Sequence, residues 1–317
     1  MTLLANMSIC NICKNEYEDD RQLHSHLKSH KLTMVQYYQQ EFPKYDLHNG
    51  EMIKFKNKNQ YFNTEFNSRI NLKAWLKSKP EEEVKKYCTE LIRRRIDQKG
   101  IKYSLSQVEI RTLLIPPIQY YDKCFGNYYQ FCETLGLKNK YSPAVKIIEE
   151  EKWKNQEYKI FIDTREQKPL KFKDRETETV TLKFGDYSFS SKEATCNCYI
   201  ERKNLSDFIG TLSGGYDRFV NEIKRAVEAK AYLVVLVEDT LPNALSFQYL
   251  PHISKKIQVT PDYIFHKVRS LIQEYSNLQF LFVAGRVEAS RVVEKIFTSG
   301  CVHETIDLQY AYDIGVL

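Results

Sequence analysis

The chain has 317 residues, 28% of them charged, and a formal net charge of +6. This length allows two or three domains, and the chain has no 18-residue apolar run, so we expect no membrane association. Residues 1–150 hold 24 Lys/Arg and 18 Asp/Glu, whereas residues 151–317 hold 23 of each. The first half is therefore the expected phosphate-binding half, although a basic surface exposed to solvent would give the same count.

The first ten residues lack the charged and apolar segments of a signal peptide, so we expect an intracellular protein, in the cytoplasm or the nucleus. In a reducing compartment, paired cysteines among the eight are better interpreted as metal ligands than as disulfides. The many Asn, Lys and Tyr residues are typical of an AT-rich genome, such as that of a virus whose protein acts in the host cell.

The first motif has the spacing of a zinc finger. Two residues separate Cys10 from Cys13, and twelve more lead to His26, which His30 follows four positions later. The two histidines share one face of a helix, and Zn²⁺ prefers four such ligands in a tetrahedron. A segment this short needs a metal to fold. We therefore predict a zinc finger and a following helix over residues 1–41.

The role of the finger stays open. His24 is a substitute ligand whose spacing fits less well. Fingers that read DNA bases usually come in arrays, and this chain has one. Contact with a protein, contact with the DNA backbone and capping of the helix expected at 33–41 are all compatible with the sequence.

Three segments are expected between the finger and residue 158. Residues 42–79 are rich in aromatic residues, Asn and Lys without a clear period, which predicts a linker. Residues 80–140 have helical patterns and are expected to form a small DNA-binding domain. Residues 141–157 are charged and contain a proline, which predicts a second linker.

The first helix of the middle domain is expected to begin at Pro80, with an acidic first turn, and to end at Gly100. Near its C-terminal end lie Arg93, Arg94 and Arg95, which are candidates for DNA binding. Cations at this end of a helix also stabilise its dipole, so a structural role is an equally good interpretation.

The next stretch contains a proline pair, a helical segment ending in Phe125-Gly126, and a second one ending in Leu-Gly-Leu at 135–137. This pattern resembles the small repeat found beside homing endonuclease domains. That resemblance implies DNA contact by Gln119, Tyr120, Tyr121 and Lys123. Aromatic residues at helical spacing are also typical of a core, so both interpretations remain open.

Three blocks at 160–166, 184–187 and 199–203 place charged residues at the ends of short apolar or β-prone runs. Such residues lie at the ends of buried strands, where a rigid sheet can direct them into one cleft. Side chains two apart on a strand share a face, so Glu201 and Lys203 should point to one side and Arg202 to the other.

These residue types suit phosphodiester hydrolysis. Two or three carboxylates can hold a hard cation such as Mg²⁺, which prefers oxygen ligands. The metal lowers the pKa of a bound water and neutralises charge on the phosphate. A lysine beside the last carboxylate can orient the water or stabilise the transition state.

The order of these blocks resembles the signature of the XPF/Mus-type nucleases, a branch of the restriction-endonuclease-like nucleases. The signature reads Gly185-Asp186, then Glu201-Arg202-Lys203, then Asp207. Residues 163–166 and 209–219 match its neighbouring blocks, and the similarity covers about residues 158–300.

The resemblance implies that Asp186 and Glu201 bind Mg²⁺ or Mn²⁺, that Lys203 is the catalytic lysine, and that Asp163 assists with the metal. The residues expected to support the site are Arg165, Glu166, Arg202, Asp207 and Arg218. DNA is the implied partner, and a homodimer through the nuclease domain is one of the oligomeric states left open.

Continuous apolar runs at 231–237 and 280–283 predict strands buried on both faces. Amphipathic helices are predicted at 216–230, 261–275 and 289–297. We therefore expect residues 158–317 to form an α/β domain with a restriction-endonuclease-like mixed sheet flanked by helices, preceded by the zinc finger and the small helical domain.

The predicted function is a Mg²⁺-dependent DNA endonuclease that hydrolyses phosphodiester bonds in branched, flap or partly single-stranded DNA. A site-specific homing-type endonuclease and a non-catalytic DNA-binding protein that uses the fold as a scaffold remain alternatives. About 20 residues follow Phe297, too few for the tandem helix-hairpin-helix module of eukaryotic and archaeal family members. DNA binding is therefore expected from the N-terminal half.

Overall fold

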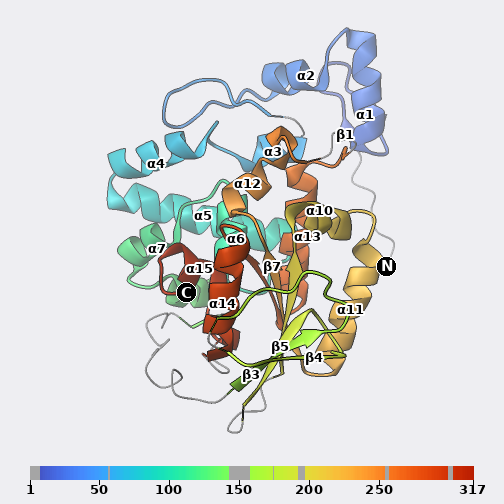
Figure 1. Ribbon diagram of the computed structural model, residues 1–317. Coiled ribbons are helices and arrows are strands. Elements are labelled where there is room, and N and C mark those ends of the chain that lie inside the picture. The colour runs from blue at the N-terminus through green and yellow to red at the C-terminus, as the bar shows by residue number, and fades with distance from the viewer. Residues whose placement is uncertain are drawn as a thin grey trace. The chain divides into compact units, whose positions relative to one another are not determined.

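The computed structural model describes residues 8–55, 58–142, 158–173, 175–191, 197–253, 257–298 and 303–317 (Figure 1). The chain divides into two compact units. The first consists of Met1–Val84 and Leu114–Pro116, and the second of Lys85–Leu113 and Pro117–Leu317. None of the described helices is long and apolar enough to cross a membrane.

The first unit begins with a ββα arrangement. Strands β1 (Ser8–Ile9) and β2 (Glu16–Tyr17) pair antiparallel. Helix α1 (Asp20–His26) follows and continues into the 3-10 turn η1 (Leu27–His30). The Asp19 side chain begins α1 by accepting a hydrogen bond of 2.8 Å from the backbone N–H of Gln22, which satisfies one of the free donors of the first turn.

The stretch at 42–79, expected to be a linker, is folded. It follows helix α2 (Met34–Glu41) and contains helices α3 (Lys58–Asn63) and α4 (Arg69–Ser78). One buried cluster joins the finger to this stretch; it contains Cys10, Leu23, Leu27, Tyr37, Tyr38, Ile53 and Tyr61. The aromatic residues of 42–79 show no period because the chain packs irregularly around Tyr38, and this hid their burial from pattern analysis.

The second unit is built on a six-stranded sheet in the order β4-β3-β5-β6-β7-β8. Its strands are β3 (Tyr158–Asp163), β4 (Thr177–Val180), β5 (Tyr187–Ser191), β6 (Cys198–Lys203), β7 (Tyr232–Val237) and β8 (Leu278–Phe282). All neighbours pair in parallel except β5, which is antiparallel to both β3 and β6. This is the predicted mixed sheet.

Helices cover both faces of the sheet (Figure 1). On β7, Leu233 and Val235 face the layer of α10 (Leu205–Leu212), α11 (Tyr216–Glu228), α12 (Leu241–Leu245) and α13 (Pro261–Glu274). Val234 and Leu236 face the layer of α14 (Arg286–Thr298) and α15 (Leu308–Asp313). Burial on both sides explains the continuous apolar run of β7. The predicted helices are confirmed with small shifts at their ends, whereas α12 and α15 were not predicted.

The middle segment contains helices α5 (Glu81–Lys99), α6 (Gln107–Thr112), α7 (Ile118–Phe125) and α8 (Tyr128–Thr134). From residue 85 on, most of it belongs to the same unit as the sheet. The ammonium of Lys140 donates to the carbonyl oxygens of Ile272 (3.2 Å), Tyr275 (2.9 Å) and Leu278 (2.8 Å). The linker expected at 141–157 lies outside the described residues from 143 on.

Candidate active site and candidate metal centre

The sheet topology brings the predicted catalytic residues to one edge. The parallel strands β3 and β6 end at this edge, and the antiparallel β5 begins there. The backbone N–H of Asp163 donates to the carbonyl of Asp186 (2.9 Å), and the N–H of Asp186 donates to the carbonyl of Ile200 (2.7 Å). Asp163, Asp186 and Glu201 therefore stand on three neighbouring segments of backbone.

Gly185 allows this close approach. Its φ is +58°, and a Cβ at this position would lie 2.7 Å from the carbonyl oxygen of Ile200. Real Cβ atoms do not approach backbone so closely, so any other residue would push Asp186 away from β6. The glycine before Asp186 is therefore required at this site for steric reasons.

Asp186 is a half-buried carboxylate, and one of its oxygens accepts no hydrogen bond from the described residues. Its Oδ2 accepts a hydrogen bond of 2.7 Å from the backbone N–H of Arg202. Among the residues that the structure describes, its Oδ1 accepts none. Burial raises the pKa of Asp186 to about 7, and the neighbouring Glu201 carboxylate adds to this rise.

The charged side chains at the end of β6 alternate between the two faces of the sheet, as expected. The ammonium of Lys203 donates to Oε1 of Glu201 at 2.7 Å, so these two side chains share one side. Arg202 points to the other side, where its Nε and Nη2 each donate to Glu166 at 2.9 Å and its Nη1 donates to Glu238 at 3.0 Å. This bidentate ion pair between Arg202 and Glu166 holds β6 against the turn after β3.

Glu222 is a member of the site that the sequence analysis missed. It lies on α11, and its side chain is half-buried. Burial raises the pKa of Glu222, the charge of Glu201 raises it further, and the backbone N–H of Gly185 counteracts part of this rise. The available signal was an acidic residue beside the inward Phe219 and Ile223 of an amphipathic helix.

Asp163 has no oxygen left for a cation. Its Oδ1 accepts from the backbone N–H (2.9 Å) and Nε (2.6 Å) of Arg165, and its Oδ2 accepts from Nη2 of Arg165 (3.1 Å) and the N–H of Leu182 (2.7 Å). Burial opposes the charged form, but these bonds hold the pKa of Asp163 below its usual value. The prediction that Asp163 assists with the metal does not fit this arrangement, because four donors fill its acceptor positions.

The other supporting residues lie further out. Asp207 accepts a hydrogen bond of 2.6 Å from the Asn204 side chain in the first turn of α10 and is exposed. Arg218 is exposed near the start of α11. In the described part of the chain, neither is hydrogen-bonded or ion-paired to Asp186 or Glu201.

The arginines predicted to bind DNA differ in exposure. Arg93 is exposed, whereas Arg94 and Arg95 are half-buried. Burial lowers the pKa of Arg95, and the charge of Glu109 counteracts this. Arg95 therefore extends toward the interior of the second unit, whereas Arg93 is accessible from solvent.

On α7, Gln119 and Lys123 are exposed and stand four residues apart on one face, and Tyr120 is half-buried. Tyr121 is fully buried, with its ring 5.1 Å from Tyr128. The prediction that Tyr121 faces DNA is therefore corrected: the tyrosine lies on the inward face of the helix and packs in the core.

The finger residues form a compact ligand set. The ligand atoms of Cys10, Cys13, His26 and His30 all lie within 4.8 Å of one another. The sulfur of Cys10 lies 3.5 Å from Nε2 of His30, and that of Cys13 lies 3.2 Å from Nε2 of His26. Ligands about 2.0–2.3 Å from Zn²⁺ in a tetrahedron have separations of about this size. His24 lies outside the set, with its Nε2 3.0 Å from the hydroxyl of Tyr38.

Comparison with known proteins finds a family model that is similar to part of the second unit. Residues 162–296 match the ERCC4 domain. This confirms the XPF-type resemblance that the sequence indicates for residues 158–300. The match does not extend to the finger or to the middle helices.

The similar solved structures include XPF from Aeropyrum pernix, alone and in complex with DNA. The sequence identity is 18% in both, and the TM-scores are 0.34 and 0.33. The match covers 44% of this chain in each case, and 59% and 62% of those chains, so this chain spans less than two thirds of their length. No curated protein matches the chain.

Proposed function

We propose that the second unit is a metal-dependent endonuclease that hydrolyses phosphodiester bonds in DNA, on branched, flap or partly single-stranded substrates. The observation that supports this most is the meeting of Asp186, Glu201 and Lys203 at one sheet edge. These residues lie within the region that matches the ERCC4 domain.

The donor set of this edge fits a hard divalent cation. Within the described chain, Oδ1 of Asp186 and Oε2 of Glu201 accept no hydrogen bond from protein groups. Glu201 destabilises the charged form of both Asp186 and Glu222. A cation would relieve this repulsion, and carboxylate oxygens are the ligands that Mg²⁺ and Mn²⁺ prefer. Asp186 and Glu201 would hold it, with Glu222 as a third carboxylate.

When bound, the cation lowers the pKa of a coordinated water and neutralises charge on the phosphate. Lys203 stands beside Glu201, where its ammonium can donate to the attacking water or to a phosphate oxygen whose charge grows in the transition state. Asp163 positions the site: it anchors the N–H of Leu182, and its own N–H holds the carbonyl of Asp186.

The first unit has its own metal in this proposal. Zn²⁺ bound by Cys10, Cys13, His26 and His30 would stabilise the finger and the helices that share its buried cluster. The second unit's sheet edge takes oxygen ligands and the finger takes sulfur and nitrogen, so the two metals would not compete for one site.

A cleavage assay tests the proposal. Zinc-loaded protein is incubated with Mg²⁺ or Mn²⁺ and with end-labelled duplex, single-stranded, flap and branched DNA of related sequence. We expect cutting near the branch or the junction of single and double strands, and none in the presence of EDTA. The matched inactive variant is Glu201→Gln, which keeps the size of the side chain.

Two other outcomes identify the alternatives. Cutting of duplex DNA at one defined sequence would indicate a homing-type enzyme, which the repeat-like pattern of α7 and α8 favours. Binding of DNA without cutting under any divalent metal would show that the nuclease fold serves only as a scaffold and would refute the proposal.

A further inference from the structure

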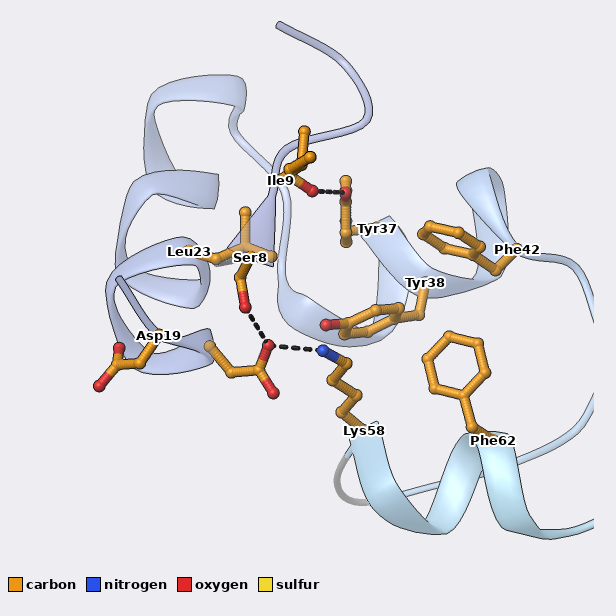
Figure 2. Close-up of a pocket in the computed structure, with 10 residues that line it drawn as sticks. Ser8, Ile9, Asp19, Leu23, Tyr37, Tyr38, Phe42, Lys58 and Phe62 are labelled. Carbon is orange, nitrogen blue, oxygen red and sulfur yellow. Dashed lines mark hydrogen bonds and ion pairs between the residues drawn. The ribbon is translucent and has the colours of Figure 1, made fainter. Parts of the chain in front are cut away.

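A cavity of about 630 Å³ lies in the first unit, and the proposed nuclease reaction does not use it. Residues of β1, α1, α2 and α3 line it, so it is formed by the finger together with the helices that follow (Figure 2). Its volume is in the range of small-molecule sites. One side is polar and the other is aromatic.

The polar side is an ion pair whose carboxylate has one oxygen, Oδ2 of Asp20, that accepts no hydrogen bond from the described residues. The ammonium of Lys58 lies 2.5 Å from Oδ1 of Asp20, and the hydroxyl of Ser8 donates to the same oxygen at 2.6 Å; Figure 2 draws both bonds. Both ion-pair side chains remain accessible, with 37% of Lys58 and 43% of Asp20 exposed. A ligand can therefore reach a hydrogen-bond acceptor and a donor at the same place.

The aromatic side exposes rings that a core would bury. Phe42 and Phe62 are each 37% exposed, and their ring centroids are 5.7 Å apart. Tyr38 stands edge-on to Phe62 at 5.6 Å and is buried behind it. Figure 2 shows the rings of Tyr38, Phe42 and Phe62 grouped on one side of the cavity, across from Ser8. This wall suits a flat ring that can cover the exposed phenyl groups.

Asp19, Asp20 and Lys58 are the charged residues of the lining, and the segment that supplies Lys58 and Phe62 has a positive balance that favours a nucleic acid as the source of that ring. Residues 51–79, which include Lys58 and Phe62, contain seven Lys/Arg and two Asp/Glu, a local excess of +5. A segment of this charge attracts a phosphate backbone and repels a basic peptide. A nucleobase also carries donors and acceptors on one edge, which matches the pairing of Asp20 with Lys58.

We propose that this pocket binds one unpaired nucleobase of single-stranded DNA. The base lies against Phe42 and Phe62, and its polar edge contacts Asp20 and Lys58. In duplex DNA, that edge is paired and both faces are stacked, so the pocket selects single strands. The inference rests on the proposed function only in taking DNA as the ligand, because base binding here requires no cleavage.

Fluorescence of 2-aminopurine tests the proposal. The probe is a short single-stranded oligonucleotide with this base analogue at its centre, and the protein is the full zinc-loaded chain carrying Asp186→Asn so that the probe stays intact. Stacking in the pocket is expected to change the emission of the probe, and the same sequence as a duplex is expected to give little change.

Phe62→Ala is expected to weaken binding of the single strand roughly 5- to 100-fold, the range for loss of one base–aromatic stack. The matched control is Tyr45→Ala, which removes an aromatic ring that is 54% exposed in the same unit but lies outside the cavity, and which should leave binding within about twofold. Asp20→Asn keeps the shape of the pocket and is expected to change the preference between cytosine and thymine at the probe position.

Zinc content of each variant checks its folding. If Phe62→Ala loses zinc, the test is the probe binding of Asp20→Asn compared with that of the control Tyr45→Ala. Unchanged emission and affinity in the pocket variants, equal losses in the control, or an equal response to duplex would overturn the proposal. If the wild type binds the base but does not cleave DNA, the proposed nuclease function is refuted and the proposed base pocket stands. If the wild type cleaves DNA but the probe emission does not change, the base pocket is refuted and the nuclease function stands.

Discussion

The finger cluster and the carboxylate edge achieve their geometry in different ways. The four finger ligands come from residues 10–30, on one hairpin turn and one helical stretch. The edge joins Asp186, Glu201 and Glu222, which come from the bend before β5, from β6 and from α11. Local chain geometry suffices for the first, whereas the second depends on the packing of the whole unit. A change at one of the two sites should therefore leave the structure of the other site unchanged.

Zinc removal is expected to have the largest effect, because structural Zn²⁺ typically contributes about 10–16 kcal/mol of apparent binding free energy. A chelator, or Cys10→Ser, should unfold the finger and expose the buried cluster that contains Tyr37 and Tyr38. The sheet of the second unit should keep its own thermal transition, measured by calorimetry. One shared transition lost on chelation would contradict the independence of the two regions.

Asp186→Asn should reduce cleavage at least about a thousandfold, since it removes a charge that acts on the reacting phosphate. The new amide can still accept from the N–H of Arg202, so folding and zinc content should be unchanged. The matched control is Asp217→Asn, an exposed aspartate at the start of α11, expected within about threefold of wild type. Single-turnover cleavage of labelled DNA gives both numbers.

Glu222→Gln should weaken Mg²⁺ binding about 10- to 100-fold, the range typical for groups that support metal ligands. The amide keeps the size of the side chain but removes the negative charge that Glu201 opposes. Calorimetric titration of the metal measures the change without relying on cleavage. Glu228→Gln, on an exposed position of the same helix, serves as the control. Equal metal affinity in both variants would exclude Glu222 from the site.

The pH dependence should be the mildest effect. Because the pKa of Asp186 is raised to about 7, its carboxyl is protonated in most metal-free molecules below that pH. A protonated carboxyl is a poor ligand, so the apparent Mg²⁺ affinity should rise about tenfold per pH unit up to pH 7 and then level off. Titrations of Mg²⁺ binding between pH 5.5 and 8.5 measure this dependence. An apparent affinity without a change of slope near pH 7 would contradict the prediction.

Two kinds of local sequence pattern predicted part of this structure: the alternation of side chains along a strand and the spacing of metal ligands. The side chains of Glu201 and Lys203 share a face because strand alternation is local, and the apolar run of β7 reflects burial on both sides. The Cys and His spacing of the finger predicts its cluster for the same reason: few residues separate the ligands.

Features set by distant contacts could not be predicted in this way. Glu222 belongs to the candidate site only because α11 packs against the sheet, within reach of the charge of Glu201. Tyr121 was expected to face DNA, but packing against Tyr128 turned it inward. Asp163 matched a metal ligand in sequence, while Arg165 and Leu182 fill its oxygens. Single-sequence patterns carry no information on such partners.

The central claim is that Asp186 and Glu201 hold a divalent cation beside Lys203. Anomalous diffraction from crystals soaked in Mn²⁺ tests it most directly. We predict a manganese peak bound by one oxygen of Asp186 and one of Glu201, with Asp163 still bonded to Arg165. A peak elsewhere, or an empty edge at millimolar Mn²⁺, would contradict the account.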